Sequence, residues 1–185
     1  MDRRQKKTRA AVFQAFSNLL LRKRFEQITV QEIIDQANIG RSTFYAHFET
    51  KNDLLKSMCT DIFHHVFTEL LPQENCGEYA QGLQNLELKL GHILYHLQEK
   101  KQPLKGILCS ESGTLFLEYL KEYLNQLFSL YLSEFDPEIP RDYLLCQLSA
   151  SFAETVKWWM LQDVGFEPEE TASFYMKFIG KSLPN

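Results

Sequence analysis

The chain has 185 residues, enough for one or two domains with a substantial buried core. Its hydrophobic content of 44% and charged content of 24% are those of an ordinary globular protein, and its formal net charge at pH 7 is −4. No apolar stretch approaches the roughly 18 residues that span a membrane, and no secretory signal follows the basic N-terminus. We therefore expect a cytoplasmic protein that has no membrane partner.

The charge is distributed unevenly along the chain. Residues 1–51 carry ten Lys/Arg and five acidic residues, a net charge of +5, whereas the remaining residues carry ten basic and nineteen acidic residues, a net charge of −9. A basic head on an acidic body favours a polyanionic partner for the head alone. A solvated charged surface would give the same pattern, so charge by itself leaves both interpretations open.

Helical periodicity begins near the N-terminus. Apolar residues at three- and four-residue spacing predict a first helix over about residues 5–22. Thr29 and Glu32 have the spacing of a capping box, which predicts the start of a second helix. Asn38 suits the end of that helix, because asparagine tolerates the left-handed backbone of a C-terminal cap. Gly40 can then begin a short third helix.

The rest of the chain also has helical patterns. Thr50 and Asp53 repeat the capping signature and open a long helix toward Leu70. Further helices are predicted over about residues 80–100, 103–109, 112–135, 140–163 and 167–180, separated by polar or proline-containing breaks. Strand alternation is absent beyond a few residues. The predicted fold is all-α with about nine helices, a three-helix N-terminal head and a helical body.

Several motifs cluster between residues 28 and 54. They are Thr29-Val30, Ala37-Asn38-Ile39, Gly40-Arg41-Ser42-Thr43-Phe44-Tyr45, Phe48 and Lys51-Asn52-Asp53-Leu54. In this combination they resemble the helix-turn-helix segment of the tetracycline-repressor family of bacterial transcriptional regulators. Asn38 stands where the family usually has glycine and Gly40 where it usually has a hydroxyl cap, and both can provide the same backbone geometry. The resemblance implies a DNA-binding domain over residues 1–50 and a ligand-binding and dimerisation domain over residues 51–185.

The resemblance also implies which side chains bind double-stranded DNA. The short third helix would enter the major groove, where an arginine at its start can pair with a guanine edge. The implied DNA-binding residues are Gln31, Arg41, Ser42, Thr43, Tyr45, His47 and Lys51. Phe44 and Phe48 would hold this helix from its buried side. Two alternatives stay open. In the first, Tyr45 only packs against its neighbours and His47 is only a solvated surface group. In the second, the helix-turn-helix motif binds another protein instead of DNA.

One short helix offers few base contacts, so useful specificity requires a homodimer on an inverted-repeat operator. Family members dimerise through a four-helix bundle of C-terminal helices. The apolar candidates for this interface are Leu148, Phe152, Trp159, Phe174 and Phe178. The alternative is that these side chains fill the core of one protomer.

By the same resemblance, the middle of the chain would bind a small-molecule effector. The candidate pocket residues are His92, Tyr95, His96, Phe116, Tyr119 and Tyr123. Such a stripe at helical spacing also suits a protein core. His92 and His96 share a helix face, but no further ligand has suitable spacing, so neither a metal nor a cofactor is predicted.

The sequence therefore predicts a dimeric, sequence-specific transcriptional regulator, a repressor that a small-molecule inducer releases from its operator. One alternative is a ligand-independent activator or co-activator of the same fold that works through a protein partner. The other is an enzyme that uses His92 and His96. The sequence contains no nucleophile elbow, phosphate loop or H-E-x-x-H motif that would support an enzyme, so we expect no enzymatic activity.

Overall fold

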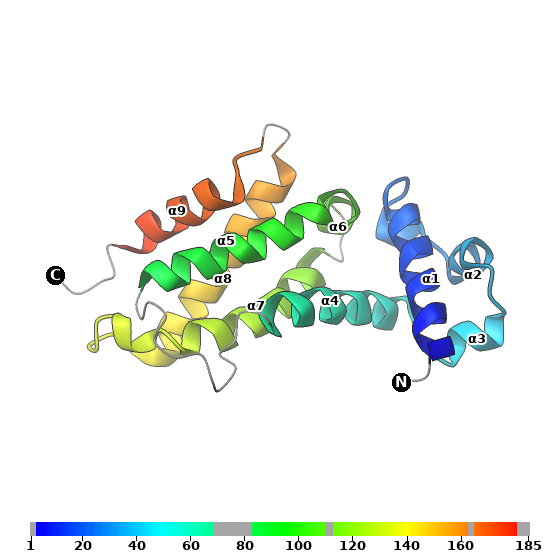
Figure 1. The fold of residues 1–185 in the computed structure, drawn as a ribbon, viewed down its shortest axis with the longest axis horizontal. Helices are drawn as coiled ribbons and strands as arrows, with labels where there is room; N and C mark the ends of the chain where they lie inside the picture. The colour runs from blue at the N-terminus through cyan, green and yellow to red at the C-terminus, as the bar shows by residue number, and fades with distance from the viewer. Residues whose placement is uncertain (1–2, 69–82, 110–112, 163–164, 181–185) are drawn as a thin grey trace. The chain divides into compact units, whose positions relative to one another are not determined.

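The computed structural model describes residues 3–68, 83–109, 113–162 and 165–180. These ranges contain nine α-helices and no strand (Figure 1). The helices are α1 (Arg3–Leu20), α2 (Val30–Ala37), α3 (Arg41–Tyr45), α4 (Lys51–Thr68), α5 (Leu83–Glu99), α6 (Lys101–Leu108), α7 (Gly113–Ser129), α8 (Arg141–Leu161) and α9 (Pro168–Ile179). The all-α prediction is confirmed. The predicted helix end at Leu70 and helix start at residue 80 lie outside the described residues.

The largest difference from the predicted helices is at the end of α7. A single helix was expected to residue 135, but α7 ends at Ser129 and a short 3-10 helix, η2 (Leu132–Glu134), follows. The Leu130 amide donates to the Leu127 carbonyl and the Tyr131 amide to the Phe128 carbonyl, at 3.1 and 2.9 Å. These i→i+3 bonds tighten the last turn and stop the α-helix. None of the described helices is long and apolar enough to cross a membrane.

The described residues form two compact units. Those within Met1–Asp61 and Gln102–Phe116 form one, here called the head unit, and those within Ile62–Lys101 and Leu117–Asn185 form the other, the body unit. The helix α6 therefore belongs to the head unit, although α5, which precedes it in the chain, belongs to the body unit. The functional division into residues 1–50 and 51–185 remains a prediction.

Aromatic rings join the helices of the head unit. The rings of Phe16 and Phe25 lie edge to face with centroids 5.9 Å apart. Phe48 packs on Phe44 at 5.6 Å and on Phe13, in α1, at 5.9 Å. An isolated helix as short as α3 is not stable in water. Its position therefore depends on the buried Phe44 and Phe48.

The body unit has its own core of aromatic side chains. Phe152 and Tyr175 pack with ring centroids 4.9 Å apart, and Phe128 lies against both. The Tyr175 hydroxyl donates to the Leu148 carbonyl at 2.8 Å, and the Trp159 indole N–H donates to the Phe166 carbonyl at 2.7 Å. Within the described residues, every buried side-chain nitrogen and oxygen atom has a hydrogen-bond partner, so α7, α8 and α9 share a core without unsatisfied side-chain donors.

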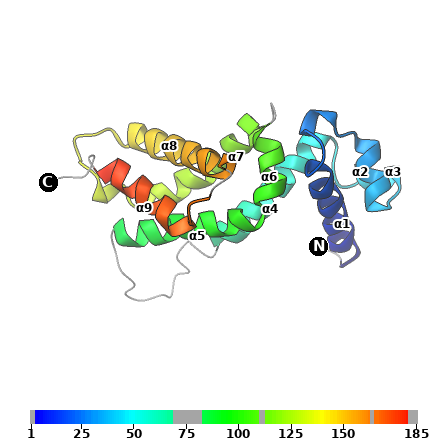
Figure 2. The same cartoon turned by 90° about the horizontal axis from the view of Figure 1, so that it is seen from above.

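The helices α5 and α9 lie along each other in the body unit (Figures 1 and 2). Their contact is close at Gly91, where a Cβ atom would lie 3.8 Å from the Ala172 methyl group. Small side chains on both helices therefore allow the two backbones to approach.

In the head unit, α6 meets the C-terminal end of α1 at a glycine. A Cβ atom added at Gly106 would lie 2.5 Å from the Leu20 carbonyl oxygen, which is backbone and has no rotamer to change. Any larger residue must push α6 away from α1.

We therefore expect Gly106→Ala to lower the free energy of unfolding by about 1–3 kcal/mol, because overpacking outweighs the better helix propensity of alanine. Urea denaturation monitored by circular dichroism would measure the change. Gly180→Ala is the matched control, since a Cβ atom there meets nothing within 4 Å among the described residues. Equal stability of the two variants would contradict the close docking of α6.

Candidate nucleic-acid interface

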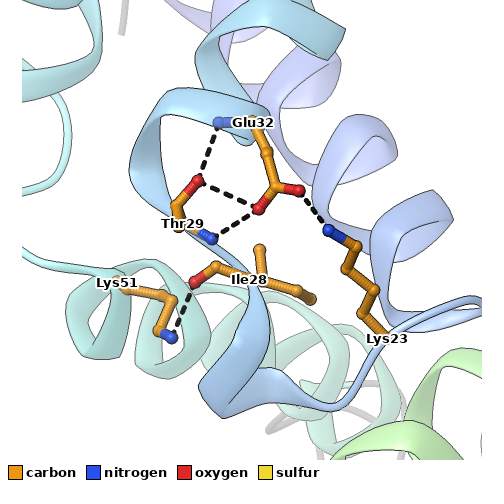
Figure 3. A network of polar contacts seen from close by, with 5 residues as sticks. All are labelled: Lys23, Ile28, Thr29, Glu32 and Lys51. Atoms are coloured by element: carbon orange, nitrogen blue, oxygen red, sulfur yellow. Dashed lines mark hydrogen bonds and ion pairs between the residues drawn. The ribbon is translucent and has the colours of Figure 1, made fainter.

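The start of α2 is fixed by a capping box (Figure 3). The Thr29 hydroxyl accepts a hydrogen bond from the Glu32 amide at 3.2 Å, and the Glu32 carboxylate accepts one from the Thr29 amide at 2.9 Å. The Lys23 ammonium pairs with the same carboxylate. These contacts hold the pKa of Glu32 well below its ordinary value, at about 2, with the Lys23 bond as the largest cause. The predicted capping box is confirmed.

The turn between α2 and α3 needs one residue in the left-handed region. Asn38 provides it with φ 51°, the only positive φ of a non-glycine residue in the described ranges. The Ile39 amide then donates to the Ile34 carbonyl at 3.2 Å, which closes the end of α2. Gly40 follows as the extended residue before α3. Asn38 thus performs the backbone role expected of it.

The polar side chains of α3 lie on its outer side. Arg41 and Ser42 are exposed and Thr43 is partly exposed. The next residue, Phe44, is fully buried. Tyr45 packs edge to face on Phe44 at 5.5 Å and still keeps 47% of its surface exposed. One side of α3 is therefore anchored in the head unit, and the other presents hydrogen-bonding groups to the surroundings.

Two further predicted residues flank this surface. His47, just after α3, is partly exposed. Gln31, on the outside of α2, donates to the Asp35 carboxylate one turn further on, at 2.8 Å. Both side chains are accessible, and their contacts with DNA stay predictions.

Lys51 has a structural role that the sequence did not indicate. Its ammonium donates to the Ile28 carbonyl oxygen at 2.8 Å (Figure 3). It also donates to the Phe25 carbonyl oxygen at 2.7 Å and lies 4.4 Å from the centre of the Phe25 ring. Partial burial lowers the pKa of this ammonium. The predicted phosphate-binding residue therefore fastens α4 to the segment before α2. The bonds join residues more than twenty positions apart, which no local motif reveals.

The predicted pocket residues lie on two helices. Phe116, Tyr119 and Tyr123 are on α7, where Phe116 is buried and the Tyr123 ring lies 5.5 Å from that of Phe63, and His92, Tyr95 and His96 are on α5. His92 and Tyr95 line a hollow of about 570 Å³ between α5 and α9, and the His96 Nε2 atom lies 3.0 Å from that of His92. The other residues lining the hollow are Glu87, Leu88, Gly91, Glu169 and Ala172. No group of three metal-ligating side chains occurs within the described ranges.

The predicted interface residues divide into two sets. Leu148, Phe152 and Trp159 are buried in the core of one protomer, as the alternative interpretation had it, so they have no surface to offer a partner. Phe174 and Phe178 are 42% and 69% exposed.

The structure adds Trp158 and Phe166 to the exposed set. Their rings stack with centroids 5.6 Å apart, and Phe166 meets Phe174 edge to face at 5.3 Å. Adjacent residues on a helix project about 100° apart, so one tryptophan of the pair in α8 is buried and the other is exposed. Trp158, Phe166, Phe174 and Phe178 are called the aromatic patch below.

Two family profiles match the chain. The profile described as "Bacterial regulatory proteins, tetR family" matches residues 14–58, and that described as "Transcriptional regulator C-terminal region" matches residues 84–181. The first includes the whole α2–α3 motif, and the second covers more than half of the chain.

Individual relatives agree with these profiles. The HTH-type dhaKLM operon transcriptional activator DhaS of Lactococcus lactis is 31% identical over 147 residues, 78% of this chain and 70% of that protein. A TetR transcriptional regulator from Streptococcus agalactiae has 34% identity and a TM-score of 0.71, over 96% of each chain. The HTH-type regulator YxbF of Bacillus subtilis is 37% identical over 79 residues, 40% of this chain. The chain spans only 21% of the length of YxbF.

The capping box makes stability depend on pH. Because the folded pKa of Glu32 lies near 2, below the ordinary value of 4.5, its ionised form stabilises the fold above pH 4.5 and the effect is lost as the pH falls toward 2. We expect Glu32→Gln to lower the urea midpoint at pH 7, and the difference from the unmodified protein to shrink between pH 4.5 and 2.

Glu49→Gln is the control, since it removes one negative charge from an exposed position of the same unit. A difference for Glu32→Gln that is as large at pH 2 as at pH 7 would show that charge plays no part in this cap.

Proposed function

The chain belongs to the tetR family of bacterial regulatory proteins, and from this membership we propose that it works as a homodimer on an inverted-repeat operator, with α3 as the reading helix. It is a DNA-binding transcriptional regulator, and proteins of this family are not enzymes. The observation that best supports α3 as the reading helix is its division into a buried Phe44 and an exposed polar side. The exposed polar side of a five-residue helix that is anchored in this way is suited to contact the major groove of DNA.

The position of Arg41 favours direct reading of a base. It begins α3 and is exposed, and a guanidinium can form two hydrogen bonds with the guanine edge in the major groove. Tyr45, Thr43 and Ser42 then lie within the next turn, where they can contact phosphates or neighbouring bases.

We expect Arg41→Ala to weaken binding of the operator by about 1–3 kcal/mol per half-site, roughly 5- to 150-fold, and to relax the preference at one base pair. Fluorescence anisotropy with the operator and with single-base variants would measure both effects. Arg141→Ala, which removes an exposed arginine from the start of α8, is the control and should leave affinity unchanged. Equal affinity of Arg41→Ala and the unmodified protein would exclude this arginine from the interface.

The aromatic patch supports dimerisation through α8 and α9. Scattered exposed apolar residues are normal, but the Phe166 ring contacts those of Trp158 and Phe174, and Phe178 is exposed on the same helix as Phe174. Phe174 and Phe178 are one helical turn apart on the same side of α9, and Trp158 contributes from α8. Aromatic residues of this kind provide most of the binding energy in interfaces.

We expect Phe174→Asp to weaken the dimer by about 2 kcal/mol or more, roughly 30-fold in Kd, because it places a charge in the interface. Analytical ultracentrifugation would measure the Kd and circular dichroism would check that the helices persist. Leu88→Asp, at a position that is 72% exposed on α5, is the control and should stay dimeric. A Phe174→Asp variant that dimerises normally would refute this interface.

The hollow between α5 and α9 is the proposed effector site. Its lining includes the apolar side chains of Leu88 and Ala172 and two acidic side chains, Glu87 and Glu169. This lining suits an apolar or cationic molecule. The helix α4 contributes residues to both units, so an effector that changes its position would change operator affinity. A coupling of 1–3 kcal/mol corresponds to roughly 5–150-fold in affinity.

We propose repression as the outcome of operator binding, with activation as the second candidate because the relative DhaS is named a transcriptional activator. In vitro transcription from a promoter that carries the operator separates them. Fewer transcripts in the presence of the protein are expected for a repressor, and more transcripts would establish an activator.

A further inference from the structure

A second hollow, of about 340 Å³, lies within the head unit between the C-terminal end of α1 and α6. The ten residues that line it are Leu20, Leu21, Arg22, Lys23, Arg24, Gln27, Gln102, Lys105, Gly106 and Cys109. The two walls of the hollow approach each other closely at Gly106 and the Leu20 carbonyl.

The hollow is strongly basic. Four of its lining residues are cationic and none is acidic. Lys23 is paired with Glu32. In the part of the chain that the structure describes, the side chains of Arg22 and Arg24 make no hydrogen bond or ion pair, and both residues are exposed.

The positive charges come from two separate parts of the sequence. Arg22 and Arg24 follow α1, whereas Lys105 arrives on α6, some eighty residues later. The fold therefore brings Lys105 to the same concave surface as Arg22 and Arg24, and a bound anion would offset the repulsion between the two arginines. Guanidinium groups are suited to phosphate, which they can bind through two parallel hydrogen bonds.

The lining of the hollow also includes an apolar side chain. Leu21 lines it and is 55% exposed, and Gly106 adds no side chain. A ligand that combines a phosphate with an apolar portion would satisfy both the arginines and this surface. We propose that the hollow between α1 and α6 binds a small phosphate monoester with an apolar group.

This hollow is separate from the exposed polar side of α3, here called the reading surface. Phe48, next to α3, packs on Phe13 in the middle of α1, whereas the hollow begins at Leu20, about 10 Å further along that helix. Its occupant would contact the segment before α2 and also α6. Ligand binding would therefore stabilise the docking of α6 in the head unit.

Phenyl phosphate is a suitable probe, and Cys109 is a built-in reporter because its exposed thiol lines the hollow. We expect phenyl phosphate to bind saturably in calorimetry and to slow alkylation of Cys109 by iodoacetamide, which mass spectrometry can follow. Alkylation of Cys146, on α8, should not respond. Benzyl alcohol, which has an aromatic ring but no phosphate, should not slow the alkylation of either thiol.

The double variant Arg22→Ala/Arg24→Ala should bind phenyl phosphate at least about tenfold more weakly, since it removes two charge-assisted contacts. Lys6→Ala/Lys7→Ala is the matched control, with the same change in charge on exposed positions of α1, and should bind as the unmodified protein does.

Three results would overturn the proposal. They are no saturable binding to the unmodified protein, equal binding by both double variants, and complete displacement of phenyl phosphate by a non-operator DNA duplex. The last would mean that the arginines contact the DNA backbone instead.

Discussion

The helix α3 has only five residues, and the proposed function depends on how it is held. Hydrogen bonding within so short a helix cannot offset the entropy of ordering it. Its position is therefore imposed by the buried Phe44, by the left-handed Asn38 that turns the chain from α2, and by the capping box that starts α2. The backbone of α3 is thus already ordered, so under the proposed function its exposed side chains would meet the DNA groove without a cost for ordering the helix itself.

The division into two units gives this head a connection to the rest of the chain. The α4 helix runs from the head unit into the body unit, and α6 returns to the head unit from the body side of the sequence. Both connections are tightly fastened within the head unit, α4 through the Lys51 ammonium on the carbonyls of Phe25 and Ile28, and α6 through Gly106 on Leu20. Under the proposed function, a ligand that displaces either helix would act on α3 through these contacts within the head unit.

Local patterns predicted most of the fold, because capping boxes, helical periodicity and turn residues act over a few residues. The Thr29 and Asn38 predictions held for this reason. Roles that depend on distant partners were not predictable. Lys51 binds carbonyls more than twenty residues away, and the sequence could not tell which tryptophan of the adjacent pair in α8 faces the core. Trp159 and Phe152 are buried, whereas Trp158 and Phe166 are exposed together with the predicted Phe174 and Phe178. The basic hollow likewise joins residues about eighty positions apart.

Selection of bound sequences from a random DNA duplex library, with the full chain at about 150 mM salt, tests the central claim most directly. The claim is that two copies of α3 read DNA in register. The expected result is an enriched inverted repeat whose half-sites lie about one helical turn apart. Enrichment of a single half-site without symmetry would contradict the dimer, and the absence of enrichment would contradict α3 as a sequence-reading element.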